Sequence, residues 1–250
     1  MFDHENKSTF PNGRNKKQPI VPIISPSLMV ADQTRLLGET LHVLSPEGGS
    51  VEWIHVDIVD GHFAHNFSFC PKTVSDLRRH LPHTFLDVHF IAKNPAIWVE
   101  PFAKAGASSF VFHVETTDDA IGVCRKIRQA GMMAGVALCE ATPVEALFPV
   151  LDAGEADMAL VMTVKSGFAG QSFKPAALEK VRVLRQRYPH LTIQVDGSIT
   201  LETIGLCAEA GANAIVPGRA VFKSENRRES VQKLRSTIQK HINQRAQSHL

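Results

Sequence analysis

Histidine and aspartate side chains interrupt apolar stretches of this sequence that otherwise have the composition of buried β-strands. His55 and Asp57 stand two residues apart in the stretch VEWIHVDIV, and Asp87 and His89 have the same spacing in TFLDVHFI. Asp196 ends the stretch LTIQVD. Side chains two residues apart share one face of a strand, and a buried carboxylate without a partner is energetically costly. These polar side chains therefore need partners inside the protein.

Two imidazoles and two carboxylates form a donor set that suits one divalent transition ion such as Zn, Mn, Fe or Co. We predict such a site from His55, Asp57, His89 and Asp196. Any one of them could be an ordinary buried polar residue, but the meeting of four at one rim argues against that. We expect Asp87 to be an outer or structural partner of the set. For His62 and His65, a substrate contact and a solvated surface position both stay open.

Eight apolar stretches alternate with helix-period segments along the chain. The stretches span residues 20–28, 51–59, 84–91, 108–114, 135–139, 158–164, 191–197 and 213–218. The amphipathic segments include 71–81, 142–154, 175–188, 200–212 and a closing helix near 227–243. Strands that alternate with helices pair in parallel through right-handed crossovers, and eight such units predict an α/β fold, a single (β/α)8 TIM barrel. An open doubly wound sheet is the alternative, but no G-x-G-x-x-G follows the first stretch.

Length and composition bound the organisation of the chain. Its 250 residues with 44% hydrophobic content suit one large core, and we expect residues 1–19 to be a disordered leader, 20–243 the barrel and 244–250 a frayed tail. A net charge of +2 gives no reason to expect nucleic acid or a membrane as a partner, and no apolar run reaches bilayer-spanning length. The four cysteines form no C-x-x-C pair, which favours a reducing, cytoplasmic location.

Glycines follow the last three predicted strands. Gly167 and Gly170 lie in VKSGFAGQSF, Gly197 in VDGS, and Gly218 precedes Arg219 in VPGRAVF. Loops at these places in a (β/α)8 barrel often offer backbone N–H groups to a phosphate, and glycine allows the close approach. Arg219 adds a possible charged fork. Glycine also makes simple turns, but its recurrence at three successive strand ends indicates a phosphate site.

Seven segments of the chain resemble a known family. They are ISPSLMVAD, WIHVDIVDGHF, LDVHFIAKNP, AGVALCEATPVEAL, LVMTVKSGFAGQSF, IQVDGSIT and AIVPGRAVF. In this order they resemble the ribulose-phosphate 3-epimerase family from about residue 22 to residue 223. The resemblance implies a (β/α)8 barrel, one divalent metal ion, inversion at C3 of a phosphorylated ketose and assembly into a homo-oligomer.

The same resemblance implies roles for individual residues. It makes His55, Asp57, His89 and Asp196 the metal ligands, and Asp57 and Asp196 also the acid–base pair. Its substrate and phosphate positions fall on Ser27, His89, Met162, Gly167, Phe168, Ala169, Gly170, Gly197, Ser198, Gly218 and Arg219. Inversion needs one carboxylate on each face of C3, because the proton leaves from one face and returns to the other. We assign Asp57 as the base of the forward reaction and Asp196 as the acid.

The chain departs from the family pattern beside the predicted site. Val59 and Ile91 stand where many members carry methionine, and Glu140, Lys165 and Arg219 replace neutral residues at the expected pocket rim. The expected substrate is a small-molecule ketose phosphate of the ribulose 5-phosphate and xylulose 5-phosphate type. A hexulose phosphate such as allulose 6-phosphate is the alternative.

Functions of other classes suit the residues less well. A non-catalytic sugar-phosphate-binding barrel would have lost metal ligands or acid–base residues, and none is missing. A related barrel decarboxylase carries a lysine between two aspartates, whereas the segment from Asp57 to Asp60 reads DIVD. An aldolase that forms a Schiff base on Lys165 would leave the metal set without a purpose.

Overall fold

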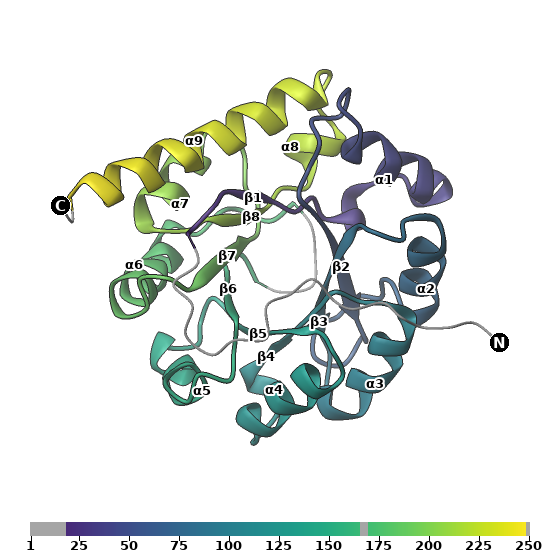
Figure 1. Cartoon of the computed structure of the whole chain (residues 1–250), viewed down its shortest axis with the longest axis vertical. Helices are drawn as coiled ribbons and strands as arrows, with labels where there is room; N and C mark the ends of the chain where they lie inside the picture. Colours follow the sequence, from purple (N-terminus) through teal and green to yellow (C-terminus); the bar gives the residue numbers. More distant parts are fainter. Residues whose placement is uncertain (1–18, 166–169, 249–250) are drawn as a thin grey trace.

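Eight parallel strands form the centre of the computed structural model, which describes residues 19–165 and 170–248. They are β1 (Ile23–Ile24), β2 (Trp53–Val59), β3 (Phe85–Ile91), β4 (Ser109–His113), β5 (Met133–Leu138), β6 (Met158–Met162), β7 (Thr192–Asp196) and β8 (Ala214–Val216). Their order in the sheet is β1-β8-β7-β6-β5-β4-β3-β2. Figure 1 shows the strands as a ring surrounded by helices. The predicted (β/α)8 barrel is therefore confirmed, and the doubly wound alternative is wrong.

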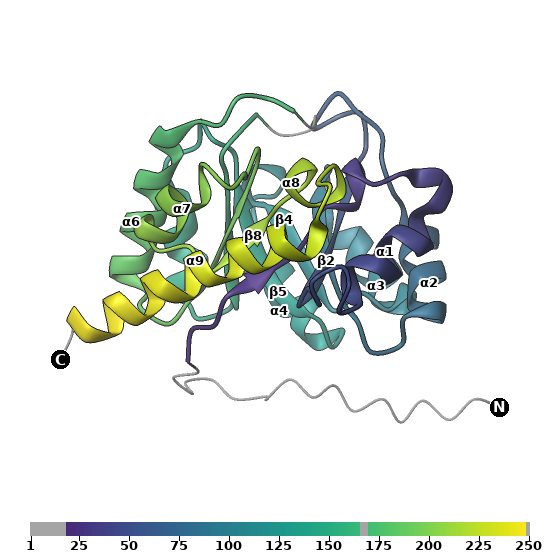
Figure 2. The ribbon, with the colours of Figure 1, turned by 90° about the horizontal axis from the view of Figure 1, so that it is seen from above.

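Helices cover the outside of this ring, as the side view in Figure 2 also shows. The α-helices are α1 (Leu36–Leu44), α2 (Pro71–His80), α3 (Pro95–Ala105), α4 (Ala120–Gln129), α5 (Phe148–Asp152), α6 (Leu178–Arg187), α7 (Ile204–Ala210), α8 (Arg219–Phe222) and α9 (Arg227–Ser248). Short 3-10 turns are η1 (Leu28–Val30), η2 (Gln33–Arg35), η3 (Val114–Thr116), η4 (Val144–Leu147) and η5 (Pro175–Ala177). Within the described residues, no helix is both long and apolar enough to cross a bilayer.

The closing helix α9 differs from its prediction at its C-terminal end. It continues to Ser248, although we expected fraying after about residue 243. Arg245, near this end, donates a hydrogen bond to the carbonyl of Ala208 on α7 at 2.6 Å. The extension is therefore held by a tertiary contact that the local sequence does not reveal. Residues 1–18 and 249–250 of the expected leader and tail lie outside the described residues.

The barrel closes between its first and second strands through a few backbone contacts. The N–H of His55 donates to the carbonyl of Pro26 at 3.1 Å, and Ser27 forms an isolated parallel bridge with His55. The N–H of Ile24 donates to the Glu52 carboxylate at 2.8 Å. Closure therefore brings Ser27 directly beside the polar residues of β2.

Side chains alternate between two layers along each strand. Ile54, Val56 and Ile58 of β2 belong to the large apolar cluster between strands and helices. Trp53, of the opposite parity, packs against a second cluster that includes Met162 and fills the barrel interior. His55 and Asp57 have the parity of Trp53, so they point inward and are almost completely buried. Their partners must lie inside the barrel.

A buried arginine holds the connection from α6 to β7 and the start of β8. Arg185 Nη1 donates to the Leu191 carbonyl at 2.7 Å, Nε to the Gly211 carbonyl at 2.9 Å, and Nη2 to Asn213 Oδ1 at 2.9 Å. Arg78 on α2 makes contacts of the same kind four βα units earlier. Each arginine thus connects its helix to the segments that precede the next two strands.

Replacing Arg185 by methionine should lower the free energy of unfolding by about 3 kcal/mol, because each buried acceptor left without a donor costs about 1–3 kcal/mol. The measurement is urea unfolding followed by circular dichroism. Arg182→Met on the same helix is the control, since Arg182 forms a surface ion pair with the exposed Glu179. It should change the free energy of unfolding by less than about 0.5 kcal/mol. Equal changes in the free energy of unfolding for both variants would contradict the stabilising role of the Arg185 hydrogen bonds.

Candidate active site

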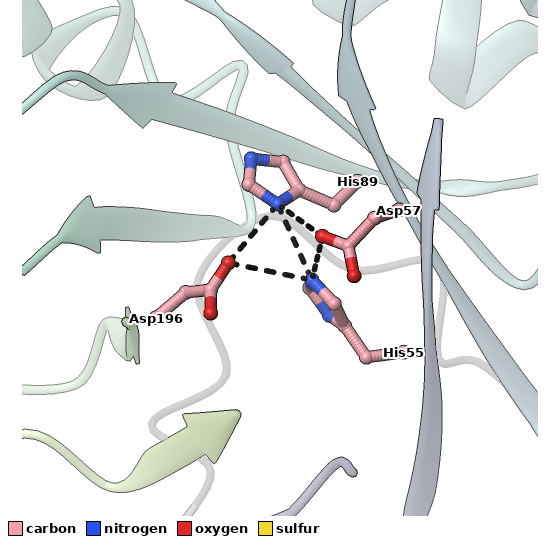
Figure 3. A group of neighbouring side chains, drawn as sticks. All are labelled: His55, Asp57, His89 and Asp196. Carbon is pink, nitrogen blue, oxygen red and sulfur yellow. Dashed lines mark hydrogen bonds and ion pairs between the residues drawn. The ribbon is translucent and has the colours of Figure 1, made fainter. Parts of the chain in front are cut away.

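Two histidines and two aspartates from three strands converge inside the barrel (Figure 3). His55 Nε2 lies 3.2 Å from His89 Nδ1, and Asp57 Oδ1 lies 3.3 Å from each of these nitrogens. Asp196 Oδ2 lies 3.8 Å from His55 Nε2 and 3.4 Å from His89 Nδ1. The structure therefore brings together all four residues that we predicted as metal ligands.

The spacing of these four atoms fits a single metal ion. Bonds of about 2.0–2.1 Å in a tetrahedral site would separate neighbouring ligand atoms by about 3.3 Å. Five of the separations among these atoms are 3.2–3.8 Å and lie close to that value. The donors are imidazole nitrogens and carboxylate oxygens, which divalent transition ions accept. The cluster could therefore hold a single metal ion.

Strand register explains why this cluster forms. β2 and β3 pair in parallel with Asp57 opposite His89 and His55 opposite Asp87. Both strands carry their polar residues at inward positions, so the two pairs come together as two adjacent rows. Asp196 ends β7 opposite Met162 and reaches the same level from the other side of the barrel.

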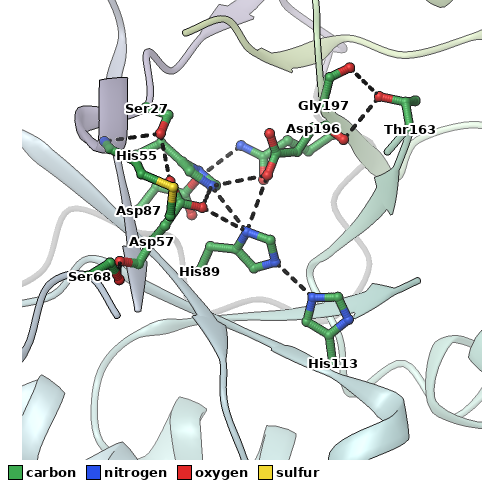
Figure 4. Close-up of polar contacts among 12 residues, drawn as sticks. Ser27, His55, Asp57, Ser68, Asp87, His89, His113, Thr163, Asp196 and Gly197 are labelled. Carbon is green, nitrogen blue, oxygen red and sulfur yellow. Dashed lines mark hydrogen bonds and ion pairs between the residues drawn. The ribbon is translucent and has the colours of Figure 1, made fainter. Parts of the chain in front are cut away.

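Asp87 lies one row deeper and satisfies the second nitrogen of His55 (Figure 4). Its carboxylate accepts hydrogen bonds from His55 Nδ1 at 2.8 Å, Ser109 Oγ at 2.6 Å and Gln194 Nε2 at 2.8 Å. Burial alone would raise the pKa of Asp87, but these donors hold it below its usual value. Because Nδ1 of His55 is engaged here, Nε2 faces the cluster, an arrangement typical of metal-binding histidines.

Opposite charges also set the ionisation of the cluster itself. Burial would lower the pKa of His55, but the carboxylates of Asp57 and Asp87 raise it above its usual value. Burial would raise the pKa of Asp57, but His55 and His89 hold it well below its ordinary range. Asp57 is therefore an ionised carboxylate, and its Oδ2 accepts a hydrogen bond from Ser27 Oγ at 2.6 Å.

A pocket of about 350 Å³ opens above the cluster. Its lining includes the predicted site residues Ser27, Asp57, Met162, Gly170, Asp196, Gly197, Ser198, Gly218 and Arg219. His89, which we also predicted to touch substrate, is fully buried and does not belong to the lining. Gly167, Phe168 and Ala169 lie outside the described residues. The pocket thus joins the carboxylates at one end to the glycine-rich loops at the other.

Comparisons with known proteins identify the family. The profile of the Ribulose-phosphate 3 epimerase family matches residues 23–222. The chain belongs to this family. Ribulose-phosphate 3-epimerase of Candida glabrata is 39% identical over 238 residues, which cover 89% of this chain and 95% of the relative. The cytoplasmic isoform of Oryza sativa subsp. japonica is 40% identical over 218 residues, covering 86% and 94%.

Solved structures agree on the fold of this epimerase family member. KGPDC from Streptococcus mutans superposes with a TM-score of 0.64. The match covers 88% of this chain and 98% of that one, at 17% sequence identity. An identity this low supports the barrel fold alone.

The departures from the epimerase family pattern fall into two groups. Lys165, Arg219 and Ile91 do line the pocket. Val59 and Glu140 do not belong to its lining. Glu140, contrary to our expectation, forms an ion pair with Lys174 at 2.7 Å. The reason is tertiary, because Lys174 lies after strand β6 and meets Glu140 only once the loops fold together.

Two histidines after β2 lie away from the site. The side chain of His62 is 77% exposed, and its backbone N–H donates to Asp60 Oδ1 at 2.8 Å. His65 is also exposed. Neither lines the pocket above the cluster. Of the two positions left open for them, the structure therefore shows the surface position and not a place in the pocket.

Sequence reasoning missed His113, which ends β4 and is fully buried. Its Nε2 lies 3.0 Å from His89 Nε2, and its Nδ1 lies 3.4 Å from Glu115 Oε2. Burial lowers the pKa of His113. Burial would raise the pKa of Glu115, but hydrogen bonds from His113, Thr142 and the Cys139 N–H lower it to about 2. The alternation of Ser109, Val111 and His113 was a usable signal, because it repeats the inward parity of β2 and β3.

Proposed function

We propose that this protein catalyses C3 epimerisation of a ketose phosphate of the ribulose 5-phosphate and xylulose 5-phosphate type. One observation supports this most directly. Asp57 and Asp196 come from β2 and β7, line the same pocket and belong to one cluster with His55 and His89. Two carboxylates on different walls of a pocket suit a reaction that removes a proton from one face of a carbon and returns one to the other.

Proton transfer is assigned to these two carboxylates. Asp57 is ionised and held by Ser27 Oγ, so it can accept the C3 proton of the ribulose epimer. Asp196 then delivers a proton to the opposite face, and the roles exchange in the reverse reaction. The hydrogen bond from Ser27 leaves Asp57 Oδ1 directed at the cluster and restricts rotation of the carboxylate.

The four donors would hold one divalent ion, which we propose to be Zn, Mn, Fe or Co. When bound, such an ion supplies Lewis-acid stabilisation of the negative charge that develops on the substrate oxygens as the C3 proton leaves. The buried residues contribute by holding their donor atoms close to the required separations before an ion arrives.

The far end of the pocket suits a phosphate group. Lys165 and Arg219 line it, and neither forms an ion pair with another residue in the described part of the chain. Gly170 and Gly197 have φ of +84° and +126°, a backbone region in which side chains are strained, and both line the same end. The two cations would balance the two charges of a phosphate monoester.

Deuterium exchange tests the proposal. In D2O, protein loaded with Mn²⁺ or Co²⁺ should place deuterium on C3 of D-ribulose 5-phosphate and form xylulose 5-phosphate, followed by ¹H NMR. Allulose 6-phosphate in a parallel sample decides between a pentulose and a hexulose substrate. Unphosphorylated ribulose is the control and should exchange far more slowly, because it leaves Lys165 and Arg219 unpaired. Absence of exchange in every ketose phosphate, with metal bound, would reject the proposal.

We further propose a cytoplasmic location and assembly into a homo-oligomer. The location is supported by the absence of a C-x-x-C pair in the sequence and by the name of the rice relative, a cytoplasmic isoform. Assembly is supported by large apolar side chains at the surface, among them Phe67, which is 80% exposed, and Ile97, which is 65% exposed. A second copy of the chain would bury such side chains.

A further inference from the structure

His113 and Glu115 continue the polar network of the site beyond the four candidate ligands. The His113 and His89 rings meet end to end with an angle of 19° between their planes and a centroid separation of 5.1 Å, and the two Nε2 atoms lie 3.0 Å apart. Glu115 Oε2 lies 3.4 Å from His113 Nδ1, while its Oε1 accepts from the Cys139 N–H at 2.8 Å and from Thr142 Oγ1. Two buried histidines therefore connect the cluster to an anchored carboxylate whose side chain is 21% exposed.

The positions of the protons in this network follow from counting them. His89 Nδ1 faces the cluster, so it must carry no proton when an ion is bound. A neutral His89 then keeps its proton on Nε2. Only one proton fits between two nitrogens 3.0 Å apart, so His113 Nε2 accepts it. His113, neutral as well, must carry its own proton on Nδ1. The acceptors within reach of that nitrogen are Glu115 Oε2 at 3.4 Å and Cys139 Sγ at 3.5 Å, and the carboxylate is the stronger of the two.

We propose that His113 and Glu115 are positioning residues that fix the tautomer and ring orientation of His89 for metal binding. The inference rests on the proposed function in taking His89 as a ligand. Each histidine of the cluster is then linked to a carboxylate outside it. His55 donates directly to the Asp87 carboxylate, whereas His89 reaches the Glu115 carboxylate through His113. Outer partners of this kind raise the basicity of a ligating imidazole.

His113, Glu115 and Cys139 also lie close enough together to hold an ion themselves, with donor atoms within 4.8 Å of one another. The proton count opposes that assignment. With ions on Nδ1 of both His89 and His113, each neutral ring would need its proton on Nε2, and two protons do not fit in a gap of 3.0 Å. Occupation of the cluster by an ion therefore leaves His113 Nδ1 as a donor to Glu115.

Cobalt binding by the full-length protein tests the positioning role. His113→Leu removes the acceptor for His89 and should weaken Co²⁺ affinity about 10- to 100-fold in a titration against a competing chelator. His113→Gln places an amide oxygen near the position of Nε2 and should recover most of the loss. Glu115→Gln keeps an acceptor but removes the charge, so its loss should be smaller than that of His113→Leu. Thermal unfolding of the metal-free proteins shows whether each variant folds.

Cys139→Ser is the matched variant for the alternative site. It should keep the wild-type affinity and the same Co²⁺ spectrum, because the four proposed ligands include no sulfur. A thiolate-to-cobalt band that is lost in Cys139→Ser would overturn the inference, since His113 Nδ1 would then serve an ion. Equal Co²⁺ affinities for the wild type and His113→Leu would also overturn it and leave the proposed function standing. If the wild type bound no Co²⁺, the positioning role would fail together with the metal site.

Discussion

Replacing Asp196 by asparagine should lower the rate of epimerisation by about 10²- to 10⁴-fold, the usual contribution of a positioned acid or base. The amide keeps an oxygen in the cluster but cannot deliver a proton. Asp57 remains, so exchange of the C3 proton of D-ribulose 5-phosphate with D2O should persist without inversion. Asp57→Asn should show the opposite pattern, with exchange retained only in xylulose 5-phosphate. Both rates are measured by ¹H NMR.

Two controls accompany this pair. Metal content of each variant, measured by elemental analysis, separates a lost proton donor from a lost ion. Asp60→Asn is the matched carboxylate, because Asp60 directly follows β2 but accepts hydrogen bonds from the N–H groups of His62, Phe63 and Lys93. It should epimerise at a rate close to that of the wild type. Near-normal epimerisation by Asp196→Asn would remove the two-carboxylate mechanism.

Removal of metal should abolish turnover and destabilise the fold. A ligand at about 1,000 times its dissociation constant stabilises the native state by about 4 kcal/mol. For a chain of this size that corresponds to a rise of about 8–16 °C in Tm. Scanning calorimetry of chelator-treated protein, with and without added Mn²⁺, Zn²⁺, Fe²⁺ or Co²⁺, measures the shift and ranks the ions. Turnover should return on addition of the ion that raises the Tm most.

His55→Leu should eliminate this metal-dependent shift, because it removes one of the four donors and the partner of Asp87. His62→Leu is the matched control, since this histidine lies only seven residues later but is exposed on the surface. It should keep the full shift. Unchanged turnover after exhaustive chelation would show that the cluster does not serve the reaction through an ion.

Much of the barrel could be predicted from local patterns. All eight predicted strands are present, because apolar runs of strand length bounded by glycine, proline and polar residues leave few other structures open. The candidate ligands could be predicted from local patterns as well. His55 and Asp57, like Asp87 and His89, stand at i and i+2, and strand geometry alone then places each pair on one face.

Other features depended on contacts between segments far apart in the sequence. Glu140 was expected at the pocket rim, but its ion pair with Lys174 lies elsewhere. The length of α9 depended on the contact of Arg245 with α7. His113 looked like the end of one more apolar strand, and only its approach to His89 reveals its role.

By itself, then, the sequence determined the kinds of donors, the strand faces that carry them and the family to which the chain belongs. The tertiary structure decided which atoms meet. Separations near 3 Å depend on the register between β2 and β3, on closure of the ring beside Ser27, and on the contact between the Nε2 atoms of His113 and His89. Such separations arise from packing of the whole barrel, whereas the periodicity of a strand describes only its own two faces.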